Sequence, residues 1–143
     1  MAGAPTLVVR PVTPGRWDDL VTLFGPSGAY SGCWCMFHRQ TSAEYAAKAG
    51  ARNRAGVWSI TCFFIDRDHR GKGIASALVG SAVGFAAKNG ATAIEGYPFD
   101  PEHKQTWNSA EAYIGTRAMF AAAGFEEVER RTPGRPLMRY TLP

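Results

Sequence analysis

The stretch ITCFFIDRDHRGKGIASALV, from Ile60 to Val79, joins three kinds of local sequence without a pause. Its first residues are mostly β-branched or aromatic, which is typical of a strand. From Ile74 onward, small and aliphatic residues predict a helix. Gly71 and Gly73, which lie between the two, would weaken either element. Glycines at such a junction indicate that something has to approach the backbone there, because a glycine has no Cβ.

A strand, a short glycine turn and a helix N-terminus together predict an anion site. Backbone N–H groups in a first helical turn lack partners within the helix, and the helix dipole adds positive charge there. Arg70 and Lys72 add two cations, and a guanidinium can hold a phosphate through two hydrogen bonds. The P-loop string G-x-x-x-x-G-K-[ST] does not occur, and Ser76 replaces the third glycine of a dinucleotide fingerprint. A plain turn without a ligand is one alternative.

Outside this stretch, apolar periodicity and capping residues predict further strands and helices. The expected strands are residues 7–12, 57–65 and 92–100 and a closing hairpin made of EEVERR and PLMRYTL, and the expected helices are residues 14–24, 41–54, 73–89 and 116–123. Thr13 should cap the first helix, and Gly90 and Gly124 should end the last two. The strand 57–65 is apolar on both faces and should be central. The order indicates an α/β fold of the α+β three-layer type, with one mixed sheet in a single domain over residues 1–143.

Composition places the chain among ordinary globular proteins. It has 143 residues, of which 45% are hydrophobic and 20% charged, and a formal net charge of +4. No apolar run approaches the roughly 20 residues of a membrane span. The start MAGAPTLVVR lacks signal-peptide features and three cysteines are an odd number, so we expect a cytoplasmic protein with no membrane partner. Basic residues are scattered apart from ERRTPGR, so nucleic-acid binding is a minor alternative.

A third kind of phosphate loop does match the glycine turn. Residues 70–75, RGKGIA, carry the pattern [Arg/Gln]-x-x-Gly-x-[Gly/Ala] at every fixed position, and MFAAAGF follows near the end of the chain. From Val57 onward the chain therefore resembles the GNAT superfamily of N-acetyltransferases, and CWCM with EGYP is similar to a bacterial subgroup of it. The resemblance implies a mixed central sheet flanked by helices. It also implies direct transfer of acetyl from acetyl-CoA to a primary amine in a ternary complex.

The same resemblance assigns cofactor-binding roles to two groups of residues. The strand end should hydrogen-bond the pantetheine arm through its backbone, and the loop should hold the pyrophosphate. The residues concerned are Phe63, Phe64 and Ile65 for the arm, and Arg70, Gly71, Lys72, Gly73, Ile74 and Ala75 for the pyrophosphate.

Acetyl transfer needs a base for the amine and an acid for the departing thiolate. Many GNAT members place a tyrosine four residues before the glycine of their final Gly-Phe, where this chain has Phe120. Tyr113 is the candidate acid, from one or two helical turns away, with a packed structural tyrosine as the alternative. Glu95 is the candidate base, because a mid-strand carboxylate is out of place unless it faces a cleft or water. Asp100 and Glu111 are weaker candidates.

The segment GCWCMFH offers three possible metal ligands, Cys33, Cys35 and His38, without a second Cys or His pair nearby. We therefore expect no metal. Aromatic and sulfur-containing residues in this place suit the acceptor-side wall that GNAT proteins build after their first helix.

One departure from the GNAT pattern is large. Only RNRAG separates the second expected helix from Val57, so the usual central hairpin is expected to be missing, which shortens the sheet by two strands. An open strand edge invites pairing with another chain, which predicts a homodimer or a swapped assembly. The loss also leaves open a CoA-binding protein without catalysis. The acceptor amine, a small molecule or a peptide, is not identified by the sequence.

Overall fold

The computed structural model describes residues 6–26, 28, 56–103, 106 and 111–143. The chain divides into two compact units, one of residues 10–55 and the other of residues 1–9 with 56–143. The second unit holds the sheet and the candidate site, and each unit is described by itself. The expectation of a single domain over residues 1–143 stays a prediction. No helix in the described part of the chain has the length and apolar character that a membrane crossing needs.

The unit of residues 10–55 contains a helix where the sequence predicts one. A 3-10 turn, Pro14–Arg16, leads into α1, Trp17–Phe24, and Gly25 ends it at a φ of 74°. Thr13 lies at the expected cap in an extended conformation, but its side chain makes no capping hydrogen bond. The expected second helix, residues 41–54, lies outside the described residues.

The predicted strand over residues 7–12 is wrong. Residues 6–12 have no regular secondary structure, and no strand of the described residues pairs with them. Val8 is 75% exposed. A β-branched run favours extended backbone, but a strand forms only where a partner supplies the ladder of hydrogen bonds.

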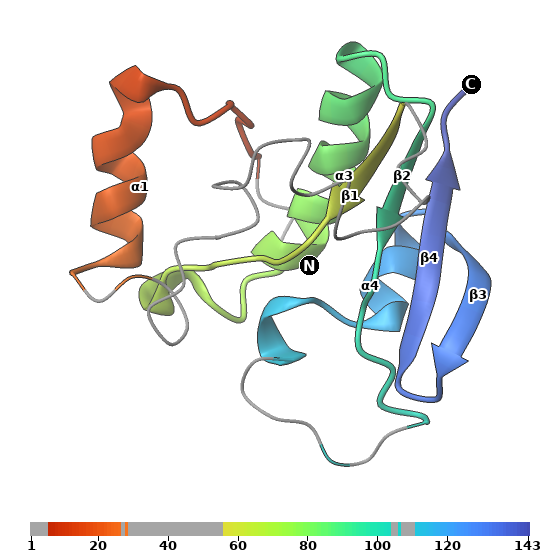
Figure 1. Cartoon of the computed structure of the whole chain (residues 1–143). Coiled ribbons are helices and arrows are strands. Elements are labelled where there is room, and N and C mark those ends of the chain that lie inside the picture. Colours follow the sequence, from red (N-terminus) through yellow and green to blue (C-terminus); the bar gives the residue numbers. More distant parts are fainter. Residues whose placement is uncertain (1–5, 27, 29–55, 104–105, 107–110) are drawn as a thin grey trace, which may run out of the picture. The chain divides into compact units, whose positions relative to one another are not determined.

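The larger unit contains a four-stranded mixed sheet in the order β1-β2-β4-β3 (Figure 1). The strands are β1 (Val57–Ile60), β2 (Ala93–Gly96), β3 (Glu126–Thr132) and β4 (Arg135–Thr141). β1 and β2 are parallel, and the other two pairs are antiparallel. The mixed sheet and the closing hairpin confirm the predicted fold class and agree with a shortened GNAT fold.

β1 differs from its prediction in length and place. It ends at Ile60 rather than at residue 65, and it pairs with β2 alone among the described strands, so it lies at the edge of the described sheet. The apolar run predicts a buried strand on both faces. Its second half, residues 61–65, has no regular secondary structure and is no longer paired with β2, and it contacts other segments as described below.

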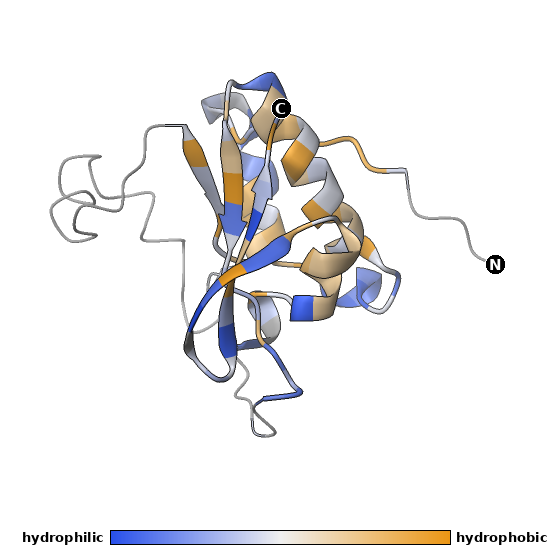
Figure 2. Cartoon of the chain, turned by 90° about the vertical axis from the view of Figure 1, so that its right-hand side faces the viewer, coloured by the Kyte–Doolittle hydropathy of each residue, from blue (hydrophilic) through white to orange (hydrophobic). Residues whose placement is uncertain are grey.

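Two helices share one core with the sheet (Figure 2). α3 (Ile74–Lys88) contributes the buried Val79 and Ala86, and α4 (Arg117–Ala122) contributes Phe120. Ile94 from β2 and Met138 from β4 complete the same cluster. The sheet therefore carries both helices against a continuous apolar face, and the start of each helix is held in a defined place.

Both helices end as their glycines predict. After α4, the Phe125 N–H donates to the Phe120 carbonyl at 3.0 Å and the Gly124 N–H donates to the Ala121 carbonyl at 3.0 Å. Gly124 has a φ of 89°, and the rings of Phe120 and Phe125 lie 5.1 Å apart. These are the two bonds and the apolar contact of a Schellman end. Gly90 ends α3 in the same way, with a φ of 79°.

Candidate active site

Beyond their four-residue ladder, β1 and β2 diverge, and a third segment lies between them. The last registered pair is Ile60 with Gly96. Further along, the Phe63 N–H donates to the Tyr113 carbonyl at 2.6 Å, and the Phe99 N–H donates to the Gly115 carbonyl at 2.9 Å. Residues 113–117 thus join the continuation of β1 to the continuation of β2.

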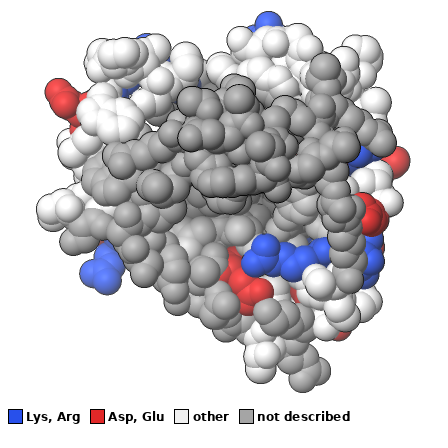
Figure 3. Space-filling view, viewed as in Figure 1, with Lys and Arg blue, Asp and Glu red and all other residues white. Residues whose placement is uncertain are grey.

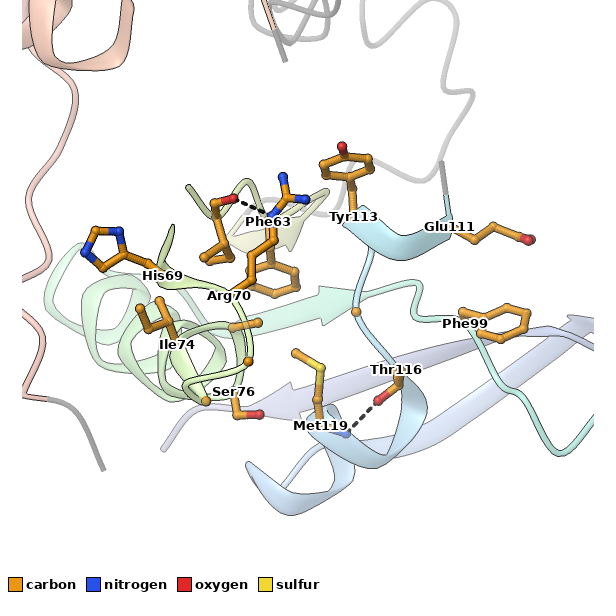
Figure 4. Close-up of a pocket in the computed structure, with 15 residues that line it drawn as sticks. Phe63, His69, Arg70, Ile74, Ser76, Phe99, Glu111, Tyr113, Thr116 and Met119 are labelled. Atoms are coloured by element: carbon orange, nitrogen blue, oxygen red, sulfur yellow. Dashed lines mark hydrogen bonds between the residues drawn. The ribbon is translucent and has the colours of Figure 1, made fainter. Parts of the chain in front are cut away.

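A cavity of about 550 Å³ opens beside this junction (Figure 4). One side is formed by the strand end, the glycine loop and the start of α3, with Phe63, Ile65, His69, Arg70, Gly71, Gly73, Ile74, Ala75 and Ser76. The other side is formed by Phe99, Glu111, Tyr113, Gly115, Thr116 and Met119. In Figure 4, His69, Ile74 and Ser76 stand on the side of α3, and Glu111, Tyr113 and Phe99 stand across from them. The cavity therefore joins the predicted anion loop to a mostly apolar wall.

The loop before α3 is held by its own hydrogen bonds. The Asp66 carboxylate accepts the Asp68 N–H at 2.9 Å and lies 3.2 Å from His69 Nδ1. These contacts, first the Asp68 N–H and then His69, lower the pKa of Asp66 below its ordinary value. Lys72 Nζ donates to the Asp68 carbonyl at 2.8 Å, and Arg70 Nε donates to the Ile65 carbonyl at 3.0 Å. The loop is therefore shaped before any ligand arrives.

The start of α3 offers backbone donors at the edge of the cavity. Gly73, the residue before the helix, has a φ of 74°, and a Cβ built on it would meet no atom within 4 Å. Gly71 has the same left-handed conformation and the same open surroundings. The first bond of the helix runs from the Ala77 N–H to the Gly73 carbonyl. The N–H groups of residues 74–76 have no acceptor within the part of the chain that the structure describes. This is the arrangement that binds phosphate at helix N-termini.

Most of the predicted cofactor residues lie together at this cavity. Phe63, Ile65, Arg70, Gly71, Gly73, Ile74 and Ala75 line it. Phe64 and Lys72 do not line it. The Phe64 ring instead stacks on Tyr113, with centroids 6.1 Å apart and planes 3° apart. The ammonium of Lys72 is engaged by the loop itself, as described above.

Glu95 is not brought to the cavity. It stands opposite Arg139 in the β2–β4 ladder, and Arg139 Nε donates to Glu95 Oε1 at 2.8 Å, with a second bond from Arg139 Nη2. Glu95 is absent from the cavity lining, while Glu111 is buried and lines it. The mid-strand carboxylate thus has a cross-strand cation as its partner.

Asp100, one of the weaker base candidates, belongs to a charged network instead. It is 1% exposed, its carboxylate accepts from Arg130 Nη2 at 2.8 Å, and His103 Nδ1 lies 2.9 Å away. Burial raises the pKa of Asp100, but these hydrogen bonds outweigh it and lower the pKa overall. Arg130 also bonds Glu127, and with Arg117 it lowers the pKa of Glu127 to about 2. The network ties the hairpin to the chain after β2.

The charged side chains of the described residues form no large patch of a single charge on the face shown in Figure 3. On the face shown in Figure 3, the described basic side chains lie apart or beside acidic ones. The dense ERRTPGR cluster is partly neutralised, because Arg130 pairs with Asp100 and Glu127.

Comparison with known proteins gives a family. The model of the acetyltransferase (GNAT) family matches residues 16–112, which is more than half of the chain. The chain belongs to the GNAT acetyltransferase family. No curated protein and no solved structure matched it. Membership indicates an acyltransferase, and the matched range includes α1, the glycine loop and the first two strands of the sheet.

The position of the frequent GNAT tyrosine is part of the core here. Phe120 is 0% exposed, and its ring lies 6.2 Å from that of Phe63. A Cβ built on Gly96 would lie 2.1 Å from Phe120 Cε1, so the ring fills the side-chain space of that glycine. Phe120 does not line the cavity, whereas its neighbour Met119 does.

Tyr113 lines the cavity, but from a different element than a GNAT helix would predict. It ends the short 3-10 turn Glu111–Tyr113, which is separate from α4. Its role as the acid stays a prediction. Gly115, whose φ is 75°, lies between this 3-10 turn and α4.

Sequence reasoning missed most of the wall opposite the loop. Phe99, Gly115, Thr116 and Met119 reach the cavity only because residues 113–117 bond to two distant strand ends. The local sequence around these residues contains little that indicates a ligand site. Thr116 is a good helix cap, and its side chain does accept the Met119 N–H at 3.4 Å, but capping alone does not indicate a ligand site.

Proposed function

We propose that this protein is an N-acetyltransferase that moves acetyl from acetyl-CoA to a primary amine by direct transfer in a ternary complex. The observation that supports this most is that one cavity is lined by the glycine loop and by the mostly apolar wall around Met119, and that the first N–H groups of α3 have no acceptor among the described residues. A nucleotide with a long, mostly uncharged arm needs both an anion site and an apolar channel in continuity.

The residues present fit that cofactor. Gly71 and Gly73 leave open space where a Cβ would stand, so a phosphate can approach the N–H groups at the start of α3. Arg70 donates from Nε to Ile65, and its terminal nitrogens have no acceptor among the described residues, so they can face an anion. We propose that residues 70–75 hold the pyrophosphate and that the backbone of residues 63–65 holds the pantetheine arm.

The transfer forms one C–N bond and breaks one C–S bond. The amine nitrogen attacks the thioester carbonyl carbon, the proton that the amine loses passes to solvent, and the leaving thiolate gains a proton. We propose that Tyr113 gives its phenolic proton to the thiolate and is reprotonated from solvent. Glu95 is the base that the sequence suggests, and its ion pair with Arg139 outside the cavity lining gives that role no geometric support.

The cofactor site is tested by calorimetric titration of acetyl-CoA into the protein and two variants. Gly73→Asp places a carboxylate where the phosphates should lie, and Gly73→Asn adds nearly the same atoms without the charge. Both tolerate a left-handed φ similarly, so their difference isolates electrostatics. We expect saturable binding by the parent, a modest loss with Asn and a loss of more than tenfold with Asp. Equal affinity in the two variants, or no binding by the parent, would contradict the proposal.

A CoA-binding protein without catalysis is the second candidate. It is favoured by Phe120, which has no proton to give and is packed into the core. The two candidate functions are distinguished by measuring the release of free CoA thiol from acetyl-CoA in the presence of a panel of primary amines. Binding without amine-dependent thiol release would support the second candidate.

We also propose a homodimer. β1 pairs with β2 on one side only among the described residues, and it stands at the edge of the described sheet. Exposed edges favour pairing with another chain. Light scattering on the purified protein tests this, and the mass of a monomer at all concentrations would contradict it.

A further inference from the structure

The cleft between the diverging strands is already occupied by the chain itself. We propose that residues 113–116 stand in the place of the pantetheine arm, and that the arm displaces the Tyr113 carbonyl from Phe63 when the cofactor binds. This inference rests on the proposed function, since it concerns how that cofactor enters.

The first argument is that the strand end is bonded to one internal acceptor and one internal donor, and the arm carries both kinds of group. The Phe63 N–H donates to a backbone carbonyl, that of Tyr113, at 2.6 Å. The Ile65 carbonyl accepts an N–H, that of Arg70 Nε, at 3.0 Å. A pantetheine arm carries two amides, each with one carbonyl and one N–H. Both internal bonds can therefore be exchanged for bonds to the arm without leaving the Phe63 N–H or the Ile65 carbonyl unpaired.

The second argument is burial. Phe63 is 9% exposed, and a backbone N–H in such a place needs a partner in every state of the protein. In the absence of the arm, Tyr113 supplies that partner. A direct bond from the arm to this N–H is then an exchange of acceptors, and it requires the Tyr113 carbonyl to leave.

The third argument is the way the segment is attached at its far end. The Phe99 N–H donates to the Gly115 carbonyl at 2.9 Å, and the Phe99 carbonyl accepts the N–H of Arg117, the residue after the segment, at 2.8 Å. Gly115 has a left-handed φ of 75°, and a turn about its N–Cα bond moves Tyr113 while the Gly115 carbonyl stays on Phe99.

The exchange has a consequence for catalysis. The ring of Tyr113 stacks on Phe64 while its carbonyl is bonded to Phe63. Release of the carbonyl shifts the whole residue, so the position of the candidate acid depends on whether the arm is bound. The protein would thus place Tyr113 for proton transfer only when a complete cofactor occupies the cleft.

The test is an NMR measurement of the scalar coupling that crosses the hydrogen bond between the Phe63 amide nitrogen and the Tyr113 carbonyl carbon. The full chain is measured ligand-free, saturated with CoA, and saturated with adenosine 3′,5′-bisphosphate, which has the phosphates but no arm. We expect the coupling in the ligand-free protein and with the bisphosphate, and its loss with CoA. Contacts between the rings of Phe64 and Tyr113, measured as a nuclear Overhauser effect, should weaken in the CoA sample alone.

The outcomes separate this inference from the proposed function. If CoA saturates the protein and the coupling persists, the displacement is wrong and the cofactor proposal stands. If the bisphosphate alone removes the coupling, the phosphates rather than the arm release the segment, and the inference is also wrong. If CoA does not bind, both proposals are contradicted.

Discussion

Many GNAT members have a tyrosine acid where this chain has Phe120, and replacing Phe120 by tyrosine tests whether that position can still act as the acid. The change adds one oxygen to Cζ of a ring that is fully buried. Cζ lies 2.6 Å from where a Cβ on Gly96 would be, so the ring edge already rests against that strand. The new hydroxyl has to push the ring away from β2 or stay without a partner.

The expected cost follows from these two effects. Overpacking of a core by one atom costs about 1–3 kcal/mol, and a buried hydroxyl without a partner costs about 1–3 kcal/mol, with partial relaxation of both. We expect Phe120→Tyr to lower the free energy of unfolding by about 2–4 kcal/mol, measured by urea denaturation. At roughly 3 °C per kcal/mol for a chain of this size, the midpoint of thermal unfolding should fall by about 6–12 °C. Phe64→Tyr, at a half-buried ring, is the control and should change stability by less than about 1 kcal/mol.

The same variant is assayed for release of CoA thiol with a panel of primary amines. We expect no gain in turnover, because Phe120 does not line the cavity. A variant as stable as the parent with faster turnover would refute the reasoning. It would mean that the ring can turn toward the thioester, and that the core position is also the acid position.

Three further perturbations probe the site and the fold. Tyr113→Phe should lower turnover at least tenfold and leave acetyl-CoA affinity within about twofold; equal turnover would remove Tyr113 from the chemistry. Glu127 has a pKa of about 2 in the folded chain, so it contributes stability above its ordinary pKa of 4.5 that is lost as the pH falls toward 2. Glu127→Gln should therefore flatten the fall in unfolding free energy between pH 4.5 and 2, and an unchanged slope would contradict the assignment. Gly96→Ala should destabilise by about 1–3 kcal/mol, whereas Gly80→Ala, on an open face of α3, should stabilise by up to about 1 kcal/mol, as urea denaturation can measure.

The parts of the fold that the sequence predicted well are those with local determinants. Gly73 before α3 and Gly124 after α4 both adopt positive φ, and each marks a helix end within one residue of its expected place. The glycine loop was predicted for the same reason. Its donors come from the first turn of a helix, and a helix start is visible in the sequence alone.

The wall of the cavity opposite that loop could not be predicted in this way. It depends on the bonds of Phe63 to Tyr113 and of Phe99 to Gly115, which join residues that lie far apart in the chain. Nothing in the local sequence of residues 111–117 indicates those partners. Tyr113 belongs to a separate 3-10 turn, Glu111–Tyr113, which the sequence did not predict, and Gly115 lies between that turn and α4.

Glu95 shows why a lone mid-strand carboxylate is weak evidence for a catalytic base. Two explanations are open for such a residue, a cleft that needs the charge or a cation on the neighbouring strand. The choice between them depends on the register of β2 against β4, whose bonded residues are 44 positions apart. The tight hairpin of β3 and β4 sets where β4 begins, and the Leu142 N–H bond to the Thr92 carbonyl aligns its far end with β2. With that register Arg139 faces Glu95, so the cation is the explanation that the contacts support, and a base for this family member has to be sought among groups that line the cavity.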